Sequence, residues 1–249
     1  MVLVVDVGNS RMKWALYDPR GWLAQGVLPN ADIGTLALRD WQNLPRPVRA
    51  VGVNVAGEAA RVRVEGQLTR WRLPMEWLHA TPAAAGVTNR YARPTQLGPD
   101  RWASLVAARR RALARGGATS ACIVVNAGTA VTIDALDTDG VFLGGLILPG
   151  IRLMIQALAD NTAALKVPQG TFAHFPTETS DAVFSGTVYA ICGAIELLRL
   201  KVGHDSSGIT CFLSGGAAHE VAPYLSGPLE VVDNLVLEGV LLLASEAEA

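Results

Sequence analysis

Hydrophobic and polar positions in the first half of the chain predict a three-strand meander followed by alternating helices and strands. Short apolar, β-branched runs bounded by turn residues indicate strands. We predict strands at 2–7, 11–17, 22–28, 48–55 and 75–78, and helices at 33–41 and 57–71. A long segment at 81–98, rich in Ala, Pro and Gly, follows, and loops of this length in compact domains are often functional. Pro99 then opens a helix that is predicted to end at Arg115, because proline suits the first helical turn.

The second half repeats this order. We predict strands at 121–126, 130–136, 141–148, 209–213 and 229–232, helices at 151–159 and 181–200, a short helix after Gly216 and a last helix from Asn234. This repeated order of strands and helices resembles the duplicated ribonuclease-H-like domains of actin-like kinases and chaperones, which are α/β proteins with a cleft between two domains. The turn residues Gly116 and Gly117 place the junction, so the predicted domains are residues 1–116 and 117–249. A single doubly wound domain is the alternative.

The chain contains two similar sequence motifs, VLVVDVGNS at Val2–Ser10 and CIVVNAGTA at Cys122–Ala130. In each, an apolar strand breaks into a polar residue, a small residue, a glycine and a hydroxyl or amide. Such a turn arrays backbone N–H groups that bind phosphate oxygens. An ordinary Asx-Gly hairpin turn explains either motif alone, but two copies in matching positions favour two phosphate-binding loops.

Residues in and next to the first motif are candidates for binding phosphate and a metal ion. Gly8 allows close approach of a ligand to the backbone, and Asn9 and Ser10 add donors. The Asp6 carboxylate would repel phosphate unless a cation lay between them, so we predict that Asp6 holds hydrated Mg²⁺. Lys13, on the next strand, is placed to reach the same phosphates.

Two further segments carry candidate chemistry. Gly215 and Gly216 follow a strand and suit an adenine ring or its ribose, although such a pair also simply begins a helix. In Gly98-Pro99-Asp100-Arg101, Asp100 either caps the predicted helix or accepts a proton from a hydroxyl nucleophile during phosphoryl transfer. Arg101 can bind a carboxylate through two hydrogen bonds. Spacing alone leaves both roles of Asp100 open.

Composition bounds the partners and the location. With 50% hydrophobic and 17% charged residues the chain is not disordered, and it has no apolar run near the ~20 residues of a membrane span. The N-terminus lacks a secretory signal pattern, so we expect a cytoplasmic protein. A net charge of −1 creates no general attraction for nucleic acid or membranes. We interpret the local exception, Arg109–Arg111, as a solvated helix end.

The cysteines and histidines indicate no metal site. Cys122, Cys192 and Cys211 are far apart in apolar stretches and are predicted to be buried thiols. The four histidines have no ligand spacing.

With DVGNS, GPDR, NAGTAVTID, Ser185-Gly186-Thr187 and LSGG in one order, the chain resembles the type III pantothenate kinases over essentially its whole length. The resemblance implies ATP-dependent phosphorylation of the 4′-hydroxyl of pantothenate, the first step of coenzyme A synthesis. It also implies a homodimer with the substrate site near the subunit interface.

The resemblance also implies site residues. It assigns ATP contacts to Asp6, Val7, Gly8, Asn9, Ser10, Arg11, Met12, Lys13, Thr129, Gly215 and Gly216. It assigns pantothenate contacts to Tyr91, Gly98, Pro99, Asp100, Arg101 and Thr187, with Asp100 as the proton acceptor. Asn126 stands where many members have an Asp that binds potassium or ammonium. Because an amide lacks the negative charge, we predict a reduced or absent potassium requirement.

Two rival functions remain. A sugar or acetate kinase of the same superfamily gives no reason for GPDR. An ATP-binding regulatory or chaperone-like switch, or a transcription accessory factor, has no need of Asp100 beside Arg101.

Overall fold

A computed structural model describes residues 1–115, 121–161, 170–203 and 208–246. Its contacts divide the chain into two compact units, Met1–Ala107 with Asn234–Ala249, and Ala108–Asp233. The C-terminal residues thus group with the first unit, unlike in the predicted division into residues 1–116 and 117–249. The predicted junction at Gly116 and Gly117 lies outside the described residues.

The first unit contains a five-stranded sheet in the order β3-β2-β1-β4-β5. Strand β1 pairs antiparallel with β2 and parallel with β4. A short hairpin, β6 with β7, lies within the segment predicted as a long loop. The strands are β1 (Val2–Val7), β2 (Arg11–Asp18), β3 (Gly21–Pro29), β4 (Arg49–Asn54), β5 (Met75–Trp77), β6 (Ala83–Ala84) and β7 (Val87–Asn89).

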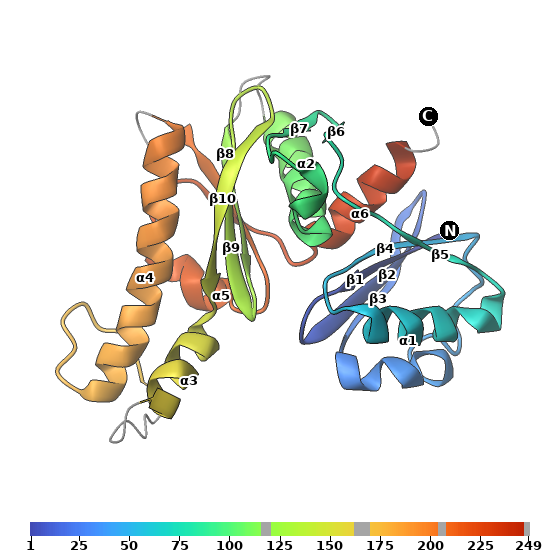
Figure 1. Cartoon of the computed structure of the whole chain (residues 1–249), viewed down its shortest axis with the longest axis horizontal. Helices are drawn as coiled ribbons and strands as arrows, with labels where there is room; N and C mark the ends of the chain where they lie inside the picture. The colour runs from blue at the N-terminus through green and yellow to red at the C-terminus, as the bar shows by residue number, and fades with distance from the viewer. Residues whose placement is uncertain (116–120, 162–169, 204–207, 247–249) are drawn as a thin grey trace. The chain divides into compact units, whose positions relative to one another are not determined.

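Helices cover both faces of this sheet, and Figure 1 shows α1 and α6 on opposite sides of β1 to β4. Leu3 and Val5 pack in the core beneath α1, whereas Val4 packs in the core with α6, because successive strand residues point to opposite faces. The helices are α1 (Glu58–Leu68), α2 (Pro99–Ala114), α6 (Leu235–Glu246) and the 3-10 helices η1 (Asn30–Leu38), η2 (Thr69–Trp71) and η3 (Pro94–Gln96). The helix predicted at 33–41 is therefore a 3-10 helix that begins earlier; Gly34 and Thr35 within it are weak α-helix formers.

The second unit repeats this strand order. Its strands lie in the order β12-β11-β8-β9-β10, with β8 antiparallel to β9 and parallel to β11, so β8 corresponds to β1. The predicted α/β fold class with two sheets is confirmed. These strands are β8 (Cys122–Ala127), β9 (Ala130–Leu136), β10 (Val141–Pro149), β11 (Thr210–Ser214) and β12 (Leu229–Val231).

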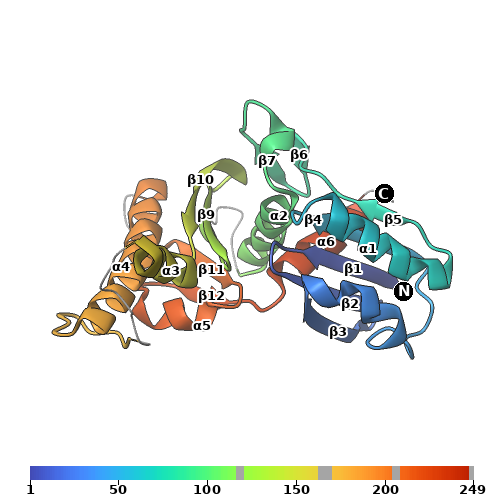
Figure 2. The ribbon, with the colours of Figure 1, turned by 60° about the horizontal axis from the view of Figure 1, so that its bottom comes forward.

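The helices of the second unit pack on its sheet, and Figure 2 shows α3 and α4 along the same side of it. They are α3 (Ile151–Asn161), α4 (Thr179–Val202), α5 (Ala218–Val221) and the 3-10 helix η5 (Ala222–Tyr224). By length and composition alone α4 is apolar enough to cross a membrane. Its residues Val188, Ile191 and Ile195 are instead buried in the core of the second unit, as in the core helix of a globular protein.

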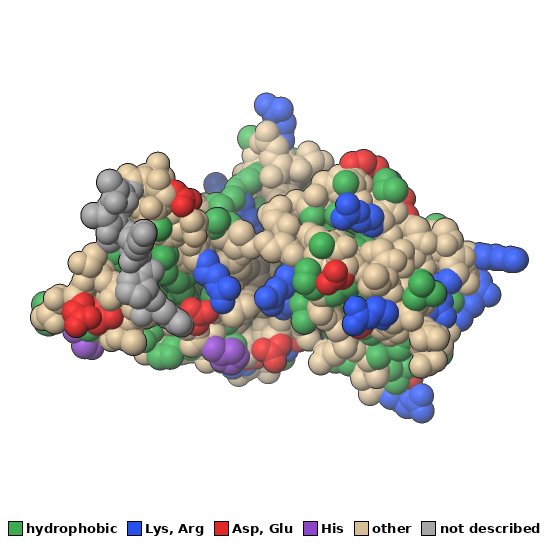
Figure 3. All heavy atoms as spheres, turned by 90° about the horizontal axis from the view of Figure 1, so that it is seen from below, with side chains coloured by type: hydrophobic (Ala, Val, Ile, Leu, Met, Phe, Trp, Pro, Cys, Tyr) green, Lys and Arg blue, Asp and Glu red, His purple; other side chains and the backbone are tan. Residues whose placement is uncertain are grey.

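Two predictions about single residues have different outcomes. The three cysteines are free and buried, as predicted. The prediction that Arg109–Arg111 form a solvated helix end is wrong for Arg109, which is buried and donates to the Thr138 carbonyl at 2.9 Å. Arg111 pairs with Glu230, and only Arg110 of the three is exposed. Consecutive helix residues point in different directions, so a run of like charges does not share one environment. Over the face in Figure 3, basic and acidic side chains are interspersed.

Candidate active site

The first phosphate loop is the turn between β1 and β2. The Gly8 N–H donates to the Arg11 carbonyl at 3.0 Å and closes the turn. Asn9, Ser10 and Arg11 are exposed. Val7 and Met12, on either side, are fully buried in the core. Of the residues predicted to contact ATP, these two therefore have only backbone groups to offer a ligand.

Asp6 lies one residue before the end of β1, opposite Lys13 on β2. Burial and, to a smaller extent, the Asp100 carboxylate raise the pKa of Asp6 to about 7, against the lowering effect of the Lys13 ammonium. Two mutually repelling carboxylates beside a phosphate loop suit a divalent cation, which would lower the cost of ionising both. Among the described residues no three His, Cys, Asp or Glu side chains form a metal cluster. A magnesium ion would thus take its other ligands from phosphate and water, as Mg²⁺ commonly does.

The predicted pantothenate residues of the first unit lie together at the start of α2. Arg101 is buried, donates from Nη1 to the Tyr91 hydroxyl at 3.3 Å, and holds its guanidinium 5.9 Å from the Tyr91 ring centroid. Asp100 Oδ1 accepts the Arg101 backbone N–H at 2.8 Å. Burial raises the pKa of Asp100, against the lowering effect of the Arg101 N–H and charge. The site thus combines a cation, an aromatic ring and a carboxylate of increased basicity.

Gly98 fixes the position of that carboxylate. A Cβ at residue 98 would lie 2.6 Å from Asp100 Oδ1, closer than real Cβ contacts come. The Gly98 carbonyl also accepts the Trp102 N–H at 2.9 Å, which begins α2. Glycine is therefore required here if Asp100 is to keep its orientation.

Asn89, which the sequence did not single out, organises the loop that carries Tyr91. It is buried, and its Nδ2 donates to the carbonyls of Thr81 at 3.3 Å and Pro94 at 3.2 Å. Its Oδ1 accepts the Tyr91 N–H at 3.0 Å. The available signal was an Asn within a long irregular segment, because Asn side chains commonly bond nearby backbone in turns.

The second phosphate loop joins β8 to β9. The Gly128 N–H donates to the Ala130 carbonyl at 3.0 Å. Asn126 lies on β8 opposite Ser214 on the parallel strand β11. Gly215 follows directly, and the Ala217 N–H donates to the Ala127 carbonyl at 3.0 Å. The structure thus brings the glycine pair beside the loop that carries Asn126 and Thr129.

Thr187 belongs to the second unit, on α4. It is buried, and its hydroxyl donates to the Phe184 carbonyl at 2.8 Å. It lines a groove of about 680 Å³ between α3 and α4, together with Pro149, Met154, Leu158, Thr179 and Gly186. The hydroxyl oxygen keeps acceptor capacity toward a ligand in this groove.

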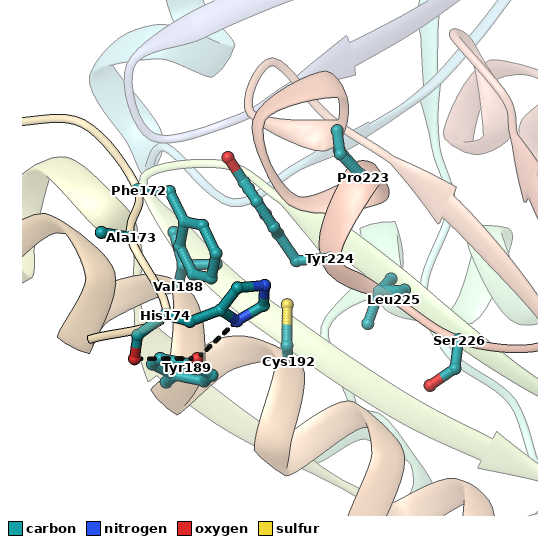
Figure 4. Close-up of a pocket in the computed structure, with 10 residues that line it drawn as sticks. All are labelled: Phe172, Ala173, His174, Val188, Tyr189, Cys192, Pro223, Tyr224, Leu225 and Ser226. Carbon is teal, nitrogen blue, oxygen red and sulfur yellow. Dashed lines mark hydrogen bonds between the residues drawn. The ribbon is translucent and has the colours of Figure 1, made fainter. Parts of the chain in front are cut away.

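A separate cavity of about 480 Å³ lies beside α4 and η5 (Figure 4). The Phe172 ring stacks near Tyr224, with centroids 4.0 Å apart, and near Tyr189 at 5.4 Å. His174 Nδ1 and the Tyr189 hydroxyl lie 3.1 Å apart. This cavity is lined by none of the predicted site residues.

Comparisons with solved structures relate this architecture to known folds. A protein from Campylobacter jejuni assigned to the Baf family of transcriptional activators has a TM-score of 0.62 at 21% identity, over 99% of this chain and 98% of that one. A protein from Sinorhizobium meliloti assigned as a 2-dehydro-3-deoxygalactonokinase has a TM-score of 0.60 at 14% identity, over 100% and 98%. At these identities the likeness concerns the fold.

Sequence relatives are much closer. The type III pantothenate kinase of Paracidovorax citrulli is 44% identical over 98% of both chains. That of Leptothrix cholodnii is 45% identical over 99% of this chain and 97% of its own. The sequence profile of the type III pantothenate kinase family matches residues 2–200. The chain therefore belongs to the type III pantothenate kinase family.

Proposed function

We propose that this enzyme transfers the γ-phosphoryl group of ATP to the 4′-hydroxyl of pantothenate, with Asp100 as the proton acceptor. Family membership supports the reaction. The observation that supports the residue role is the position of Asp100. Its carboxylate accepts the backbone N–H of Arg101, whose side chain bonds to Tyr91, and its charge acts on Asp6 in the strand before the first phosphate loop.

In the proposed reaction, the Asp100 carboxylate takes the hydroxyl proton as the pantothenate oxygen forms its bond to the γ-phosphorus. The bond from that phosphorus to the β–γ bridging oxygen breaks, and ADP leaves. Burial favours this role, because a raised pKa makes the carboxylate a stronger base. Arg101 binds the pantothenate carboxylate, and the other pantothenate contacts are assigned to Tyr91, Gly98, Pro99 and Thr187.

ATP contacts are assigned to both loops. The backbone of Asp6 to Lys13 and the Lys13 ammonium bind phosphate oxygens, Thr129 acts from the second loop, and Gly215 with Gly216 contacts the adenosine. Asp6 would hold Mg²⁺ with water between them. When bound, the ion neutralises charge on the β- and γ-phosphates.

The monovalent cation is proposed to bind weakly at Asn126. Asn126 offers one neutral oxygen where a carboxylate would favour potassium or ammonium. The enzyme is therefore expected to work with little or no potassium.

We also infer that the enzyme acts as a cytoplasmic homodimer. Apolar side chains of β10 and α3 are exposed beside the Thr187 groove, with Ile147 65% and Leu153 45% accessible. Exposed apolar surface of this kind marks protein contacts. Light scattering during size exclusion is expected to give twice the chain mass, and Ile147→Glu to give a monomer. A wild-type monomer at assay concentration would contradict the dimer.

The function is tested by ADP release with and without pantothenate. Release should depend on pantothenate, and Asp100→Asn should lower kcat by about 10² or more with the fold intact. Release that ignores pantothenate would favour the regulatory switch or transcription accessory factor. An Asp100→Asn enzyme near wild-type turnover would instead remove only the assignment of the base.

A further inference from the structure

One residue just beyond β3 holds the whole first phosphate loop. The Asn30 side-chain Nδ2 donates to the Gly8 carbonyl at 2.8 Å and to the Asn9 carbonyl at 3.0 Å. Its backbone N–H donates to the Ser10 carbonyl at 3.1 Å. Three consecutive loop carbonyls therefore point toward Asn30.

This arrangement sets the direction of the N–H groups. The chain contains no cis peptide bond among its described residues, and in a trans peptide the C=O and the next N–H point in opposite directions. The N–H groups of Asn9, Ser10 and Arg11 thus point away from Asn30. Successive N–H groups turned to one side are what a phosphate-binding loop requires.

The second loop shows what Asn30 adds. Gly150 follows Pro149 at the end of β10 as Asn30 follows Pro29 at the end of β3, and its N–H donates to the Thr129 carbonyl at 2.9 Å. The backbone bond is thus repeated without a side chain. A Cβ at residue 150 would lie only 2.7 Å from the Thr129 oxygen. The second loop therefore has no room for a side-chain clamp, that is, for a side chain that holds loop carbonyls as the Asn30 amide does.

The first loop is also one residue longer. Gly8 closes its turn onto Arg11, whereas Gly128 closes its turn onto Ala130. A longer turn has one more peptide whose direction must be fixed. The Asn30 amide fixes the two peptides that the backbone bond does not hold.

The amide acts toward the loop only as a donor. Asn30 Oδ1 is buried and has no hydrogen-bond partner within the described part of the chain. A flipped amide, or a carboxylate of the same shape, would place an oxygen against two carbonyl oxygens. An aspartate at residue 30 would therefore repel the groups that asparagine holds.

We propose that Asn30 is a positioning residue for ATP, acting through the backbone of residues 8–10 rather than by touching the nucleotide. This inference rests on the proposed function, since it assigns the loop to ATP phosphates. It requires that a change at residue 30 alter ATP binding selectively.

Asn89 offers a matched comparison within the same unit. It too donates through Nδ2 to two carbonyls, those of Thr81 and Pro94, but it orders the segment that carries Tyr91. Asn30→Asp and Asn89→Asp are thus the same chemical change on two loops assigned to different substrates.

The test uses the full-length enzyme and ADP-release kinetics with each substrate varied in turn. Asn30→Asp should raise KM for ATP at least about tenfold while KM for pantothenate stays within about twofold, and Asn89→Asp should give the reverse. Titration with a non-hydrolysable ATP analogue should show the same loss for Asn30→Asp. Equal effects of Asn30→Asp on both KM values, or none on either, would overturn the proposal.

Asn30→Gly keeps the test decisive if Asn30→Asp does not fold. It reproduces the residue found at position 150, retaining the backbone bond and removing the clamp. It should weaken ATP binding by at least about threefold, because both side-chain hydrogen bonds to the loop are lost, and unchanged ATP binding would contradict the clamp. A wild-type enzyme without pantothenate-dependent turnover would overturn the proposed function instead.

Discussion

The Asp100 carboxylate adds to burial in raising the pKa of Asp6 to about 7, so the proposed base and the proposed metal-side carboxylate are electrostatically coupled. Either group ionises more readily when the other is neutral. A cation near Asp6 would therefore also change the pKa of Asp100.

This coupling predicts the pH dependence of ATP use. In the free enzyme Asp6 is largely protonated below pH 7, and a protonated carboxyl binds Mg²⁺ with its waters poorly. We expect kcat/KM for ATP to fall about tenfold per pH unit on the acid side of pH 7. Initial rates at saturating pantothenate between pH 5.5 and 8.5 measure this, and a flat profile would contradict it.

The same shift predicts that Asp6 destabilises the fold. Its pKa is higher in the folded protein than its ordinary value of 3.8. The folded state therefore binds the proton more tightly, and stability from this group is lost as the pH rises toward 7. Asp6→Asn should raise the melting temperature more at pH 8 than at pH 5, by about 2–4 °C for each kcal/mol recovered. Scanning calorimetry without nucleotide checks this, and an equal change at both pH values would refute it.

Gly98→Ala should separate turnover from folding. The added methyl would displace the Asp100 carboxylate, which is the end of a movable side chain, rather than the backbone. We expect kcat to fall by about 10² with the melting temperature nearly unchanged, on the scale of a misplaced catalytic group. Ala103→Gly, a change of similar size further along α2, is unsuitable as a control because Ala103 is in the core. Gly66→Ala, where a Cβ meets nothing within 4 Å, provides the control.

Asn126→Asp should create a potassium response. The substitution restores a charged ligand at the end of β8. We expect wild-type rates to be similar in potassium and sodium buffers, and the variant to be faster in potassium. A wild-type enzyme that already requires potassium would contradict the assignment of Asn126.

Local patterns in the sequence predicted the strands other than β6 and β7, and they suggested the two phosphate loops, because alternation and glycine turns act over a few neighbouring residues. Asp100, Arg101 and Tyr91 were also identified from sequence, and the structure brings them together. Asn30 and Asn89 were missed, since their importance lies in which carbonyls they meet. Asn30 contacts a loop more than 20 positions earlier in the chain. The burial of Arg109 likewise depends on the distant Thr138.

The grouping of α6 with the first unit has a consequence for synthesis of the chain. Residues 1–107 leave the ribosome long before residues 235–246, yet Leu237 and Val240 of α6 cover the sheet face that contains Val4 and Val51. Until α6 has been synthesised, that face of the nascent first unit is without its apolar cover. A truncated product that ends before α6 would therefore expose core surface and tend to aggregate.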